Sequence, residues 1–499
     1  MTPISQQYRI KSAVNNLTAD SRAVTQGSLF LAYLGTKTDG RNYIANAIEN
    51  GASAVIWDSA DFEWNPQWLV ENIAVKNLRL QSGFIAHQYY NEPSTKMWMI
   101  GVTGTNGKTS ITHWLGQCFN YLNRKTAIIG TLGNGFADAL TPTVNTTPDA
   151  VMLHATLAQF HKLQTEIVAM EVSSHGIHQG RINGVHFDVA VLSNLTRDHL
   201  DYHGTQEQYA AEKRRLFDSK NLSMAVLNAD DEFGQRVEQE LKILGTPMTT
   251  YGIDHGDVQA SNIAFDNTGF SFNVTTPYGD GMVSANLIGR FNVYNILAVL
   301  ATLLVSKVSL ADSIMAINHI TSAPGRMQQI GGGDLPLIVV DYAHTPDALE
   351  KVLTTLKEQL TPANKLICVF GCGGNRDAGK RELMGSIASR IANAVVVTSD
   401  NPRHENERKI IHDILQGIEG NYVVEIDRAK AISIAILSAK AGDIVLIAGK
   451  GHEDYQEING IKHPFSDIEQ VQQILTQLKG VDGSVIKDAT KDAFIGFAS

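Results

Sequence analysis

The sequence contains few cysteines and has no excess of positive charge. Its three cysteines (Cys118, Cys368 and Cys372) cannot form a disulfide framework, and none lies in a Cys-x-x-Cys pair, so we expect reduced, buried thiols. The formal net charge of −10 at pH 7 argues against a general nucleic-acid binder, which needs clustered lysine and arginine. It does not exclude a small anionic ligand, which needs only a local positive pocket.

Long apolar runs are also missing. The longest one, residues 296–305, is about half of the roughly 20 residues that span a membrane. The first ten residues contain no apolar core, so we expect no signal peptide. We therefore expect a soluble cytoplasmic protein with no membrane insertion and no nucleic-acid partner, and we expect it to be a monomer.

A glycine-rich turn between a predicted strand and a predicted helix is the most informative stretch. The turn reads Gly104-Thr-Asn-Gly-Lys-Thr-Ser110, and apolar residues recur at helical spacing after it. Glycines let the backbone approach an anion, the helix start presents free N–H groups, and Lys108 adds a positive charge. Thr109 or Ser110 would supply a hydroxyl to Mg²⁺. The lysine, the hydroxyl pair and the helix together favour a phosphate site over a turn that binds nothing.

The length of 499 residues suggests three domains at about 150 residues each, and the strand and helix patterns agree. Residues 1–95 hold two strand-like runs around a helical stretch, which predicts a small N-terminal α/β module. Residues 96–322 begin with the glycine-rich turn and alternate buried strands with helices, which predicts a central ATPase-like domain with a parallel sheet. Its part from about 247 to about 290 alternates in polarity, which indicates antiparallel hairpins at the sheet edge. Residues 323–499 predict a Rossmann-like, doubly wound C-terminal domain, so the fold class is α/β.

Polar residues follow four predicted strands of the C-terminal domain, each at its carboxyl end. Open α/β sheets bind ligands at this edge, so four such ends predict a binding site there. The segments are Asp341-Tyr-Ala-His344, Gly371–Asp377, Asp400-Asn-Pro-Arg403 and Gly449–Asp454.

Several segments of the middle domain allow two interpretations. Glu171 ends a predicted strand, where a Mg²⁺ carboxylate lies in many phosphate-loop ATPases. His199 and His203 are spaced as a zinc pair, but no third soft ligand is evident, which favours a Mg²⁺ contact or structural hydrogen bonds. The run Glu212-Lys-Arg-Arg215 is typical of a solvated helix face. Asparagines at the start of an apolar helix, Asn292 and Asn295, either contact an adenine or cap the helix.

Taken together, motifs along nearly the whole chain resemble the Mur ligase family, ATP-dependent enzymes that add amino acids to the peptide of the cell-wall precursor. Within the family, Asp400–Arg403 and Gly449–Glu453 are similar to the motifs of the enzymes that add meso-diaminopimelate as the third residue. The other motifs that carry the resemblance are Asp20-Ser-Arg22, Gly104-Thr-Asn-Gly-Lys-Thr109, Asn145-Thr-Thr147, Glu171-Val-Ser-Ser174, Asn194-Leu-Thr-Arg-Asp-His199, Tyr294-Asn295, Pro324-Gly-Arg326 and Asp341-Tyr-Ala-His-Thr-Pro346.

The resemblance implies ATP and Mg²⁺ as cofactors. It implies that Lys213 is carbamylated by CO₂ and that Lys108, Lys213 and His199 are catalytic. The residues implied for ATP are Gly104, Thr105, Asn106, Gly107, Lys108, Thr109, Ser110, Asn292, Asn295, Arg326 and Asp341. Those implied for the metal are Ser110, Glu171, His199 and the carbamate of Lys213.

The resemblance also implies two substrates, UDP-N-acetylmuramoyl-L-alanyl-D-glutamate and meso-diaminopimelate. The first would contact Ala19 (through its backbone, since relatives often carry leucine there), Ser21, Thr36, Lys37, Thr38, Asn145, Thr146, Thr147, Ser173, Gln179 and Arg181. The second would contact Arg376, Asp400, Asn401, Pro402, Arg403, Gly449 and Glu453. Because Arg403 can bind a carboxylate with two parallel hydrogen bonds, we expect lysine to be rejected, since it would leave Arg403 buried and unpaired.

Four rivals remain at this point. A lysine-adding ligase is disfavoured by Arg403, and a folylpolyglutamate synthase by the domain ahead of the glycine-rich turn. A nucleotide-dependent switch or scaffold would hydrolyse ATP without any UDP-sugar peptide. A muropeptide sensor would not need Lys108.

Overall fold

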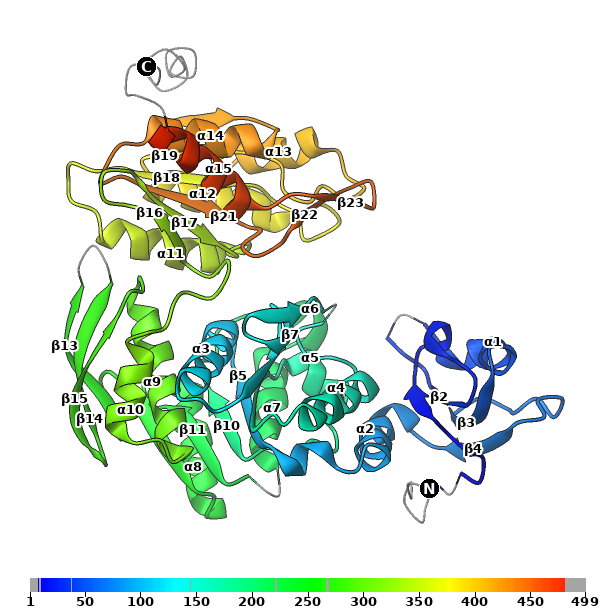
Figure 1. Ribbon diagram of the computed structural model, residues 1–499. Coiled ribbons are helices and arrows are strands. Elements are labelled where there is room, and N and C mark those ends of the chain that lie inside the picture. The colour runs from blue at the N-terminus through cyan, green and yellow to red at the C-terminus, as the bar shows by residue number, and fades with distance from the viewer. Residues whose placement is uncertain are drawn as a thin grey trace. The chain divides into compact units, whose positions relative to one another are not determined.

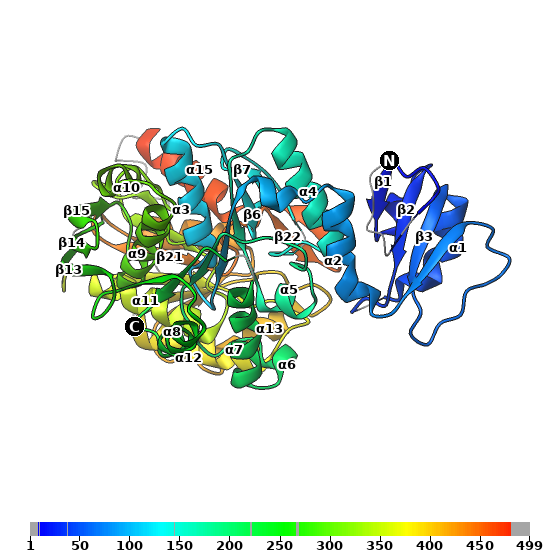
Figure 2. The same cartoon turned by 90° about the horizontal axis from the view of Figure 1, so that it is seen from below.

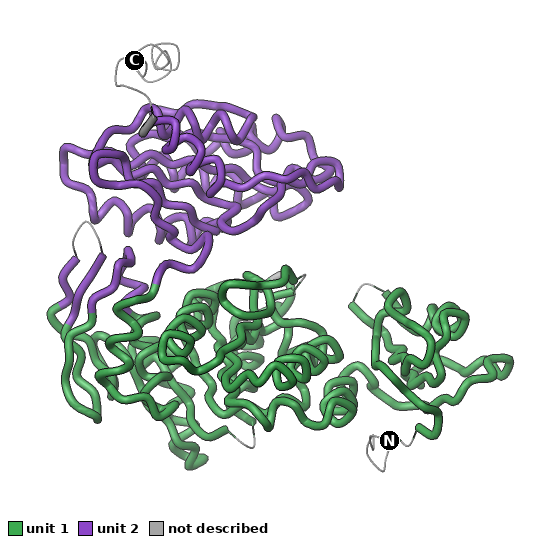
Figure 3. Tube along the Cα trace, viewed as in Figure 1, with its two compact units in different colours: residues 1–262, 273–283, 294–320 green, residues 263–272, 284–293, 321–499 purple. Residues whose placement is uncertain are grey.

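The computed structural model describes residues 8, 10–36, 38–143, 145–219, 222–265 and 269–480. Contacts divide the chain into two units (Figure 3). Unit 1 comprises residues 1–262, 273–283 and 294–320, and unit 2 comprises residues 263–272, 284–293 and 321–499. Within the described part of the chain, no helix is both long enough and apolar enough to cross a membrane.

The first sheet of unit 1 has four parallel strands in the order β1-β2-β3-β4. Its two faces are covered by different helices, and Figure 2 shows the strands side by side with α1 beside them. Continuous apolar runs explain the central strands, which are buried on both faces. The elements are β1 (Asn16–Thr18), β2 (Ser28–Ala32), β3 (Ala52–Asp58), β4 (Glu71–Val75), α1 (Ile44–Glu49) and α2 (Leu78–Tyr89).

The second sheet has eleven strands in the order β15-β14-β13-β12-β11-β10-β5-β9-β6-β7-β8 (Figure 1). The strands from β13 to β6 in this order pair in parallel, whereas β6, β7 and β8 pair antiparallel, so the sheet is mixed. Its strands are β5 (Trp98–Thr103), β6 (Thr126–Gly130), β7 (Gly133–Phe136), β8 (Ala139–Thr141), β9 (Ile167–Glu171), β10 (Val189–Leu192), β11 (Met224–Asn228), β12 (Met248–Gly252), β13 (Val258–Phe265), β14 (Phe270–Thr276) and β15 (Gly279–Ala285).

Helices connect these strands, and several begin at side chains that cap them. Asp149 accepts hydrogen bonds from two backbone N–H groups at the start of α4, and Asp231 does the same for α8, which ends at Gly245. The boundary between the two units falls within β13, β14, β15 and α9. The helices are α3 (Lys108–Tyr121), α4 (Ala150–Lys162), α5 (Ser174–His178), α6 (Leu200–His203), α7 (Gln206–Arg214), α8 (Glu232–Leu244), α9 (Arg290–Val305) and α10 (Leu310–Ile317).

The main sheet of unit 2 has six strands in the order β16-β17-β21-β18-β19-β20, and only β16 is antiparallel among the pairs described. Hydrophobic clusters fill both of its faces. A hairpin of β22 and β23 follows β21. The elements are β16 (Gln328–Gly331), β17 (Leu337–Asp341), β18 (Leu366–Phe370), β19 (Ala394–Val397), β20 (Tyr422–Val424), β21 (Ile444–Ala448), β22 (Tyr455–Ile458), β23 (Ile461–Pro464), α11 (Pro346–Glu358), α12 (Gly379–Ile391), α13 (Glu407–Leu415), α14 (Arg428–Ser438) and α15 (Asp467–Gly480).

The predicted α/β class is confirmed. The central sheet is mixed, and its antiparallel pairs β6–β7 and β7–β8 lie outside the region from 247 to 290 where antiparallel hairpins were expected. The region from residue 247 departs from the prediction at its start, because β12 pairs in parallel with both β11 and β13. All three cysteines are buried and free, as expected. The domain boundaries drawn after residues 95 and 322 stay predictions.

Candidate active site

The glycine-rich turn lies at the carboxyl end of β5 and leads directly into α3. Gly104 (φ 141°) and Gly107 (φ 87°) have backbone conformations that favour glycine. A Cβ atom at Gly104 would collide with Oγ of Ser193, and one at Gly107 would collide with Oδ1 of Asn295. Nζ of Lys108 lies over the turn, 2.9 Å from the carbonyl oxygen of Gly104. The turn therefore has the shape of a phosphate loop, and below we call residues 104–110 the phosphate loop.

The segment that follows β10 braces the phosphate loop. The carbonyl oxygen of Asn194 accepts a hydrogen bond from the N–H of Thr105 at 2.8 Å, and its Oδ1 accepts one from the N–H of Asn106 at 3.0 Å. Oγ of Ser193 donates to the carbonyl of Asn106 at 2.6 Å. The sequence motif contained Asn194, but only the fold shows that this residue and Ser193 hold the loop.

Glu171, at the end of β9, is 2% exposed and faces the start of α3. Its Oε2 accepts a hydrogen bond from Oγ1 of Thr109 at 3.0 Å, and its Oε1 accepts one from the N–H of Thr131 at 2.7 Å. Two hydroxyls were considered as metal ligands, those of Thr109 and Ser110. The hydroxyl of Thr109 is the one that donates to the carboxylate of Glu171, and Ser110, the next residue, is buried. Hard oxygen donors of this kind suit Mg²⁺.

Lys213 on α7 is almost completely buried, with 1% of its surface exposed. Its Nζ donates to the carbonyl of Gly104 at 2.7 Å and lies 4.5 Å from the ring centroid of Tyr209. No carboxylate of the described residues lies within ion-pair distance of it. Burial, and then the charge of Lys108, lowers the pKa of Lys213 well below its ordinary value, while Asp198 opposes this. The solvated-face interpretation is therefore wrong for Lys213.

The two histidines that were considered as a zinc pair have different surroundings. Nε2 of His203 lies 3.0 Å from Oγ of Ser174, and burial lowers the pKa of His203. The ring of His199 lies 6.0 Å from that of Tyr209, which also contacts Lys213. Among the residues described, no group of three or more His, Cys, Asp and Glu side chains is placed to hold a metal.

Five of the residues implied for the muramoyl-peptide form a connected network in unit 1. Nη1 of Arg181 donates to the carbonyl of Thr147 at 2.7 Å, and its Nε donates to Oε1 of Gln179 at 2.9 Å. Oγ1 of Thr147 lies 3.0 Å from Oγ of Ser173, and Oγ1 of Thr146 lies 3.0 Å from that of Thr131. Since Thr131 also contacts Glu171, this network reaches the phosphate loop.

Two residues of this network were missed by the sequence analysis. Thr131 lies between Thr146 and Glu171, and the hydroxyl of Tyr202 accepts a hydrogen bond from Nε2 of Gln179 at 3.0 Å. Asn145, in contrast, is exposed.

The residues implied for the uridine end follow the carboxyl ends of β1 and β2. Ala19 and Ser21 come after β1, and Thr36 and Thr38 come after β2. No hydrogen bond between the described residues joins the two groups. Lys37 lies outside the described residues.

In unit 2, the residues implied for the nucleotide make contacts within the fold. The carboxylate of Asp341 accepts hydrogen bonds from the N–H groups of Met327 (2.7 Å) and Ala343 (2.8 Å), and burial raises its pKa. The guanidinium carbon of Arg326 lies 4.7 Å from the ring centroid of Tyr342. Asn292 lies inside α9, and its Nδ2 donates to the carbonyl of Ile288 at 2.7 Å, which differs from a helix cap, whose side chain accepts from a backbone N–H. Asn295, which belongs to unit 1, lies close to Gly107.

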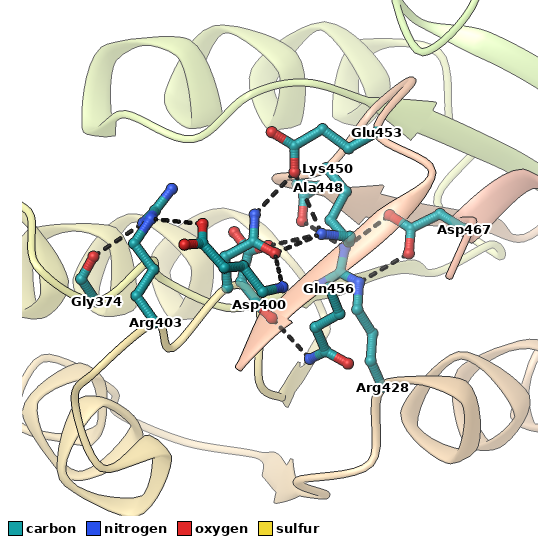
Figure 4. Close-up of polar contacts among 11 residues, drawn as sticks. Gly374, Asp400, Arg403, Arg428, Ala448, Lys450, Glu453, Gln456 and Asp467 are labelled. Carbon is teal, nitrogen blue, oxygen red and sulfur yellow. Dashed lines mark hydrogen bonds and ion pairs between the residues drawn. The ribbon is translucent and has the colours of Figure 1, made fainter. Parts of the chain in front are cut away.

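Arg403 is already paired, which corrects one expectation. Its Nε lies 3.2 Å from Oε2 of Glu457, and its Nη1 donates to the carbonyl of Gly374 at 2.8 Å (Figure 4). A ligand without a second carboxylate would therefore not leave Arg403 unpaired. Glu457 lies on the β22–β23 hairpin and was missed, because no local pattern predicts this long-range contact. An arginine has five N–H donors, and Nη2 makes no hydrogen bond with the described residues, so it can still bind a ligand.

The other residues implied for diaminopimelate divide into a clustered group and an exposed one. Nδ2 of Asn401 donates to Oε2 of Glu453 at 2.8 Å, and a Cβ atom at Gly449 would lie 3.3 Å from Oδ2 of Asp400. Pro402, the residue after Asn401, is also buried. Arg376 is exposed and makes no hydrogen bond or ion pair with the described residues.

A braced phosphate loop, with a lysine over it and a buried glutamate and threonine beside it, defines a phosphate-loop protein of the nucleotide-binding α/β class. Three family models match the chain: "Mur ligase family, catalytic domain" at residues 13–90, "Mur ligase middle domain" at residues 102–303, and "Mur ligase, glutamate ligase domain" at residues 325–451. The chain belongs to the Mur ligase family.

Individual relatives agree over almost the full length. A protein of Chromobacterium violaceum is 50% identical over 465 residues, which are 93% of this chain and 94% of the relative. One of Nitrosomonas europaea is 46% identical over 489 residues, 94% of each chain. A solved structure is similar with a TM-score of 0.70 and 37% identity, and the match covers 95% of this chain and 98% of the other. All three are named UDP-N-acetylmuramoyl-L-alanyl-D-glutamate--2,6-diaminopimelate ligase.

Proposed function

We propose that this chain uses ATP to join meso-diaminopimelate to the D-glutamate of UDP-N-acetylmuramoyl-L-alanyl-D-glutamate, in the synthesis of the peptidoglycan precursor. The observation that carries the proposal is the match over 93% of the chain to relatives with that name, on a chain whose phosphate loop is intact. The coupling of ATP to an acid explains why the family fold combines a phosphate loop with a second, polar site.

The reaction needs an activated carboxylate, because a carboxylate anion does not react with an amine. The γ-carboxylate of the D-glutamate attacks the γ-phosphorus of ATP, which gives an acyl phosphate and ADP. The amine of diaminopimelate then attacks the acyl carbon, and phosphate leaves. Lys108 would offset negative charge on the phosphates as the acid approaches. Bound Mg²⁺ would supply further charge neutralisation and orient the phosphate oxygens.

Glu171 and Thr109 would provide oxygen ligands to the metal, and Lys213 would provide more after reaction with CO₂. A carbamate forms when the neutral amine of a lysine attacks CO₂ and loses a proton, which replaces a cation by an anion. Burial and the charge of Lys108 favour the neutral amine of Lys213, which supports this assignment. His199 would complete the set of metal ligands, since it lies near the ring of Tyr209, which Lys213 also contacts.

Arg403 would bind the distal carboxylate of diaminopimelate through the end of its guanidinium, while Asn401 and Glu453 bind the other polar groups. Lysine lacks this carboxylate and would lose the two hydrogen bonds. Because Glu457 and Gly374 pair Arg403 without a ligand, the penalty for lysine is the lost interaction rather than a bare buried charge.

One assay separates this function from its rivals. The release of ADP is measured with ATP and Mg²⁺, with and without the UDP-dipeptide, and with either diaminopimelate or lysine. We expect ADP release only when the UDP-dipeptide and diaminopimelate are both present. Release that is independent of the UDP-dipeptide would favour a switch or scaffold, and comparable turnover of lysine would contradict the chosen substrate.

A further inference from the structure

Lys450 lies in the loop after β21 and has none of its surface exposed. It is not among the residues proposed above to bind diaminopimelate, yet it contacts three of them. Its Nζ lies 3.0 Å from Oδ1 of Asn401, 3.2 Å from Oε2 of Glu453 and 3.4 Å from Oδ1 of Asp400 (Figure 4). An ammonium group has three N–H donors and no acceptor, so these contacts use its full capacity.

The first contact fixes the side-chain amide of Asn401. Oδ1 of Asn401 accepts hydrogen bonds from Nζ of Lys450 and from the N–H of Glu457 at 2.9 Å. The opposite orientation of the amide would place its NH₂ group against two donors, so Lys450 excludes it. Nδ2 must therefore face Glu453, to which it donates at 2.8 Å. The second N–H of Nδ2 has no acceptor among the described residues, so a ligand can accept from it.

The second contact gives the two carboxylate oxygens of Glu453 different surroundings. Oε2 accepts hydrogen bonds from both Lys450 and Asn401. Oε1 has no hydrogen-bond partner among the described residues, and the side chain is 19% exposed. One cation faces the carboxylates of Asp400 and Glu453, so this group of three charges carries one net negative charge. A ligand ammonium would balance that charge at Oε1.

A buried ion pair holds the loop from behind. The side chains of Arg428 and Asp467 are both 0% exposed, and Nε and Nη2 of Arg428 donate to the two oxygens of Asp467 at 2.7 Å each. Nη2 also donates to the carbonyl of Ala448, the last residue of β21, at 3.1 Å. Figure 4 shows this pair next to the start of the loop. The backbone that carries Lys450 is therefore fixed to α14 and α15.

We infer that Lys450 is a positioning residue for the amino acid that is ligated. It orients Asn401 and Glu453 so that one N–H donor and one carboxylate oxygen face the ligand together. A donor beside an acceptor complements a carboxylate beside an ammonium, which is one end of an α-amino acid. The role rests on the proposed function, since it assigns Lys450 to the same binding site.

A simple charge-balancing role for Lys450 leads to different expectations. Such a role requires only a cation in this place, and Lys450→Arg would satisfy it. The positioning role requires three donors around one small centre, and a planar guanidinium cannot direct them to the same three acceptors. The two roles therefore differ in the effect of a substitution that keeps the charge.

The experiment measures steady-state ligation with the full chain and the Lys450→Met and Lys450→Arg variants. We expect both variants to raise the KM for diaminopimelate by about tenfold or more, as expected when a buried polar contact is lost. We expect kcat at saturating diaminopimelate, and the KM for the UDP-dipeptide, to stay within about threefold, because the lost interactions are with the amino acid alone. Leu353→Ala is the control, because it removes packing from α11 in the same unit without touching this group or the helices α14 and α15 that hold its loop. It should lower the thermal stability and leave the KM unchanged.

A double-mutant cycle with Glu453→Gln tests whether Lys450 acts through Glu453. Lys450→Met raises the KM by one factor in the wild type and by another in the Glu453→Gln background. The second factor should be smaller than the first by about fivefold or more. Additive effects, or a KM within about twofold of wild type in a folded Lys450→Arg variant, would overturn the inference. If Lys450→Met does not fold, Lys450→Arg and its cycle with Glu453→Gln decide the outcome. A wild-type chain that shows no diaminopimelate-dependent ADP release would instead overturn the proposed function.

Discussion

Two lysines of this chain are buried to the same degree, and their surroundings are opposite. Lys213 in unit 1 is 1% exposed and donates to one acceptor among the described residues, a backbone carbonyl. Lys450 in unit 2 is 0% exposed and has two carboxylates and an amide oxygen. Burial alone disfavours a charged amine, and nearby carboxylates favour it. The number of carboxylate partners therefore separates a lysine suited to react as a neutral amine from one suited to hold other groups as a cation.

The largest effect is expected from Lys213→Met. Without a carbamate at this position the metal would lose oxygen ligands, so ligation should fall by about 10³-fold or more. The fold should not suffer, because the substitution removes a buried amine that lacks a carboxylate partner, and stability should be unchanged or higher by about 1 kcal/mol. All five tryptophans lie in the sequence of unit 1, so their fluorescence during urea unfolding measures the free energy of unfolding of this unit.

Lys213→Arg is the matched control, since it keeps a cation that CO₂ does not carbamylate. It should be as inactive as Lys213→Met. Ligation by either variant at more than about a tenth of the wild-type rate would contradict the role of Lys213.

The next largest effect concerns the amino acid. Arg403→Ala should lower kcat/KM for diaminopimelate by about 30-fold or more and change kcat/KM for lysine little, because only diaminopimelate offers a carboxylate to Arg403. Glu457→Gln is the comparison variant, because it keeps an acceptor for Nε of Arg403 and should keep the preference. The two amino acids are offered in separate assays. An unchanged preference in Arg403→Ala would contradict the assigned carboxylate contact.

The contrast between the lysines also predicts an effect on stability. Lys450→Met leaves the buried carboxylate of Asp400 and the partly buried one of Glu453 without their cation, which should destabilise unit 2 by about 3 kcal/mol. Since unit 2 has no tryptophan, hydrogen exchange of peptides that cover β21 and β18 is the suitable measurement. Faster exchange there, with exchange of β5 and β9 unchanged, is the expected result. Unchanged protection of β21 would show that Lys450 is not needed to balance the carboxylates.

The smallest effect is a dependence on CO₂ and pH. Because burial and Lys108 lower the pKa of Lys213, part of its amine is neutral at pH values where an exposed lysine is protonated. As the pH falls toward that lowered pKa, the amine gains a proton and the carbamate is lost. Removal of bicarbonate should therefore lower the rate a few-fold, by more at pH 7 than at pH 9. Equal rates with and without bicarbonate across this range would contradict the prediction.

Continuous apolar runs made most of the fold predictable. The continuous apolar runs at 167–170, 189–192, 366–370 and 394–397 all lie in strands, because a strand covered by helices on both faces needs apolar residues throughout. The glycine-rich turn was predictable too, since its function requires residues in a fixed local order. The parallel pairing of β12 was not, because register between distant strands leaves no local pattern.

The two lysines show where sequence analysis of a site fails. Lys213 lies in a run of charges, and the run predicts a solvated face. The neighbours that reveal its burial are Tyr209 and Ala210, four and three residues earlier on the same side of α7. Lys450 follows a wholly buried strand and lies between two glycines, and this local pattern could have indicated that the lysine belongs to the site. Glu457 had no such signal, because its contact with Arg403 depends on how the β22–β23 hairpin folds back.

The most direct test of the comparison is ¹³C NMR of the full chain in ¹³C-labelled bicarbonate. We expect one carbamate resonance in the wild type, its loss in Lys213→Arg, and its persistence in Lys450→Met. A spectrum without a carbamate resonance, or one whose carbamate resonance survives in Lys213→Arg, would contradict the carbamylation of Lys213.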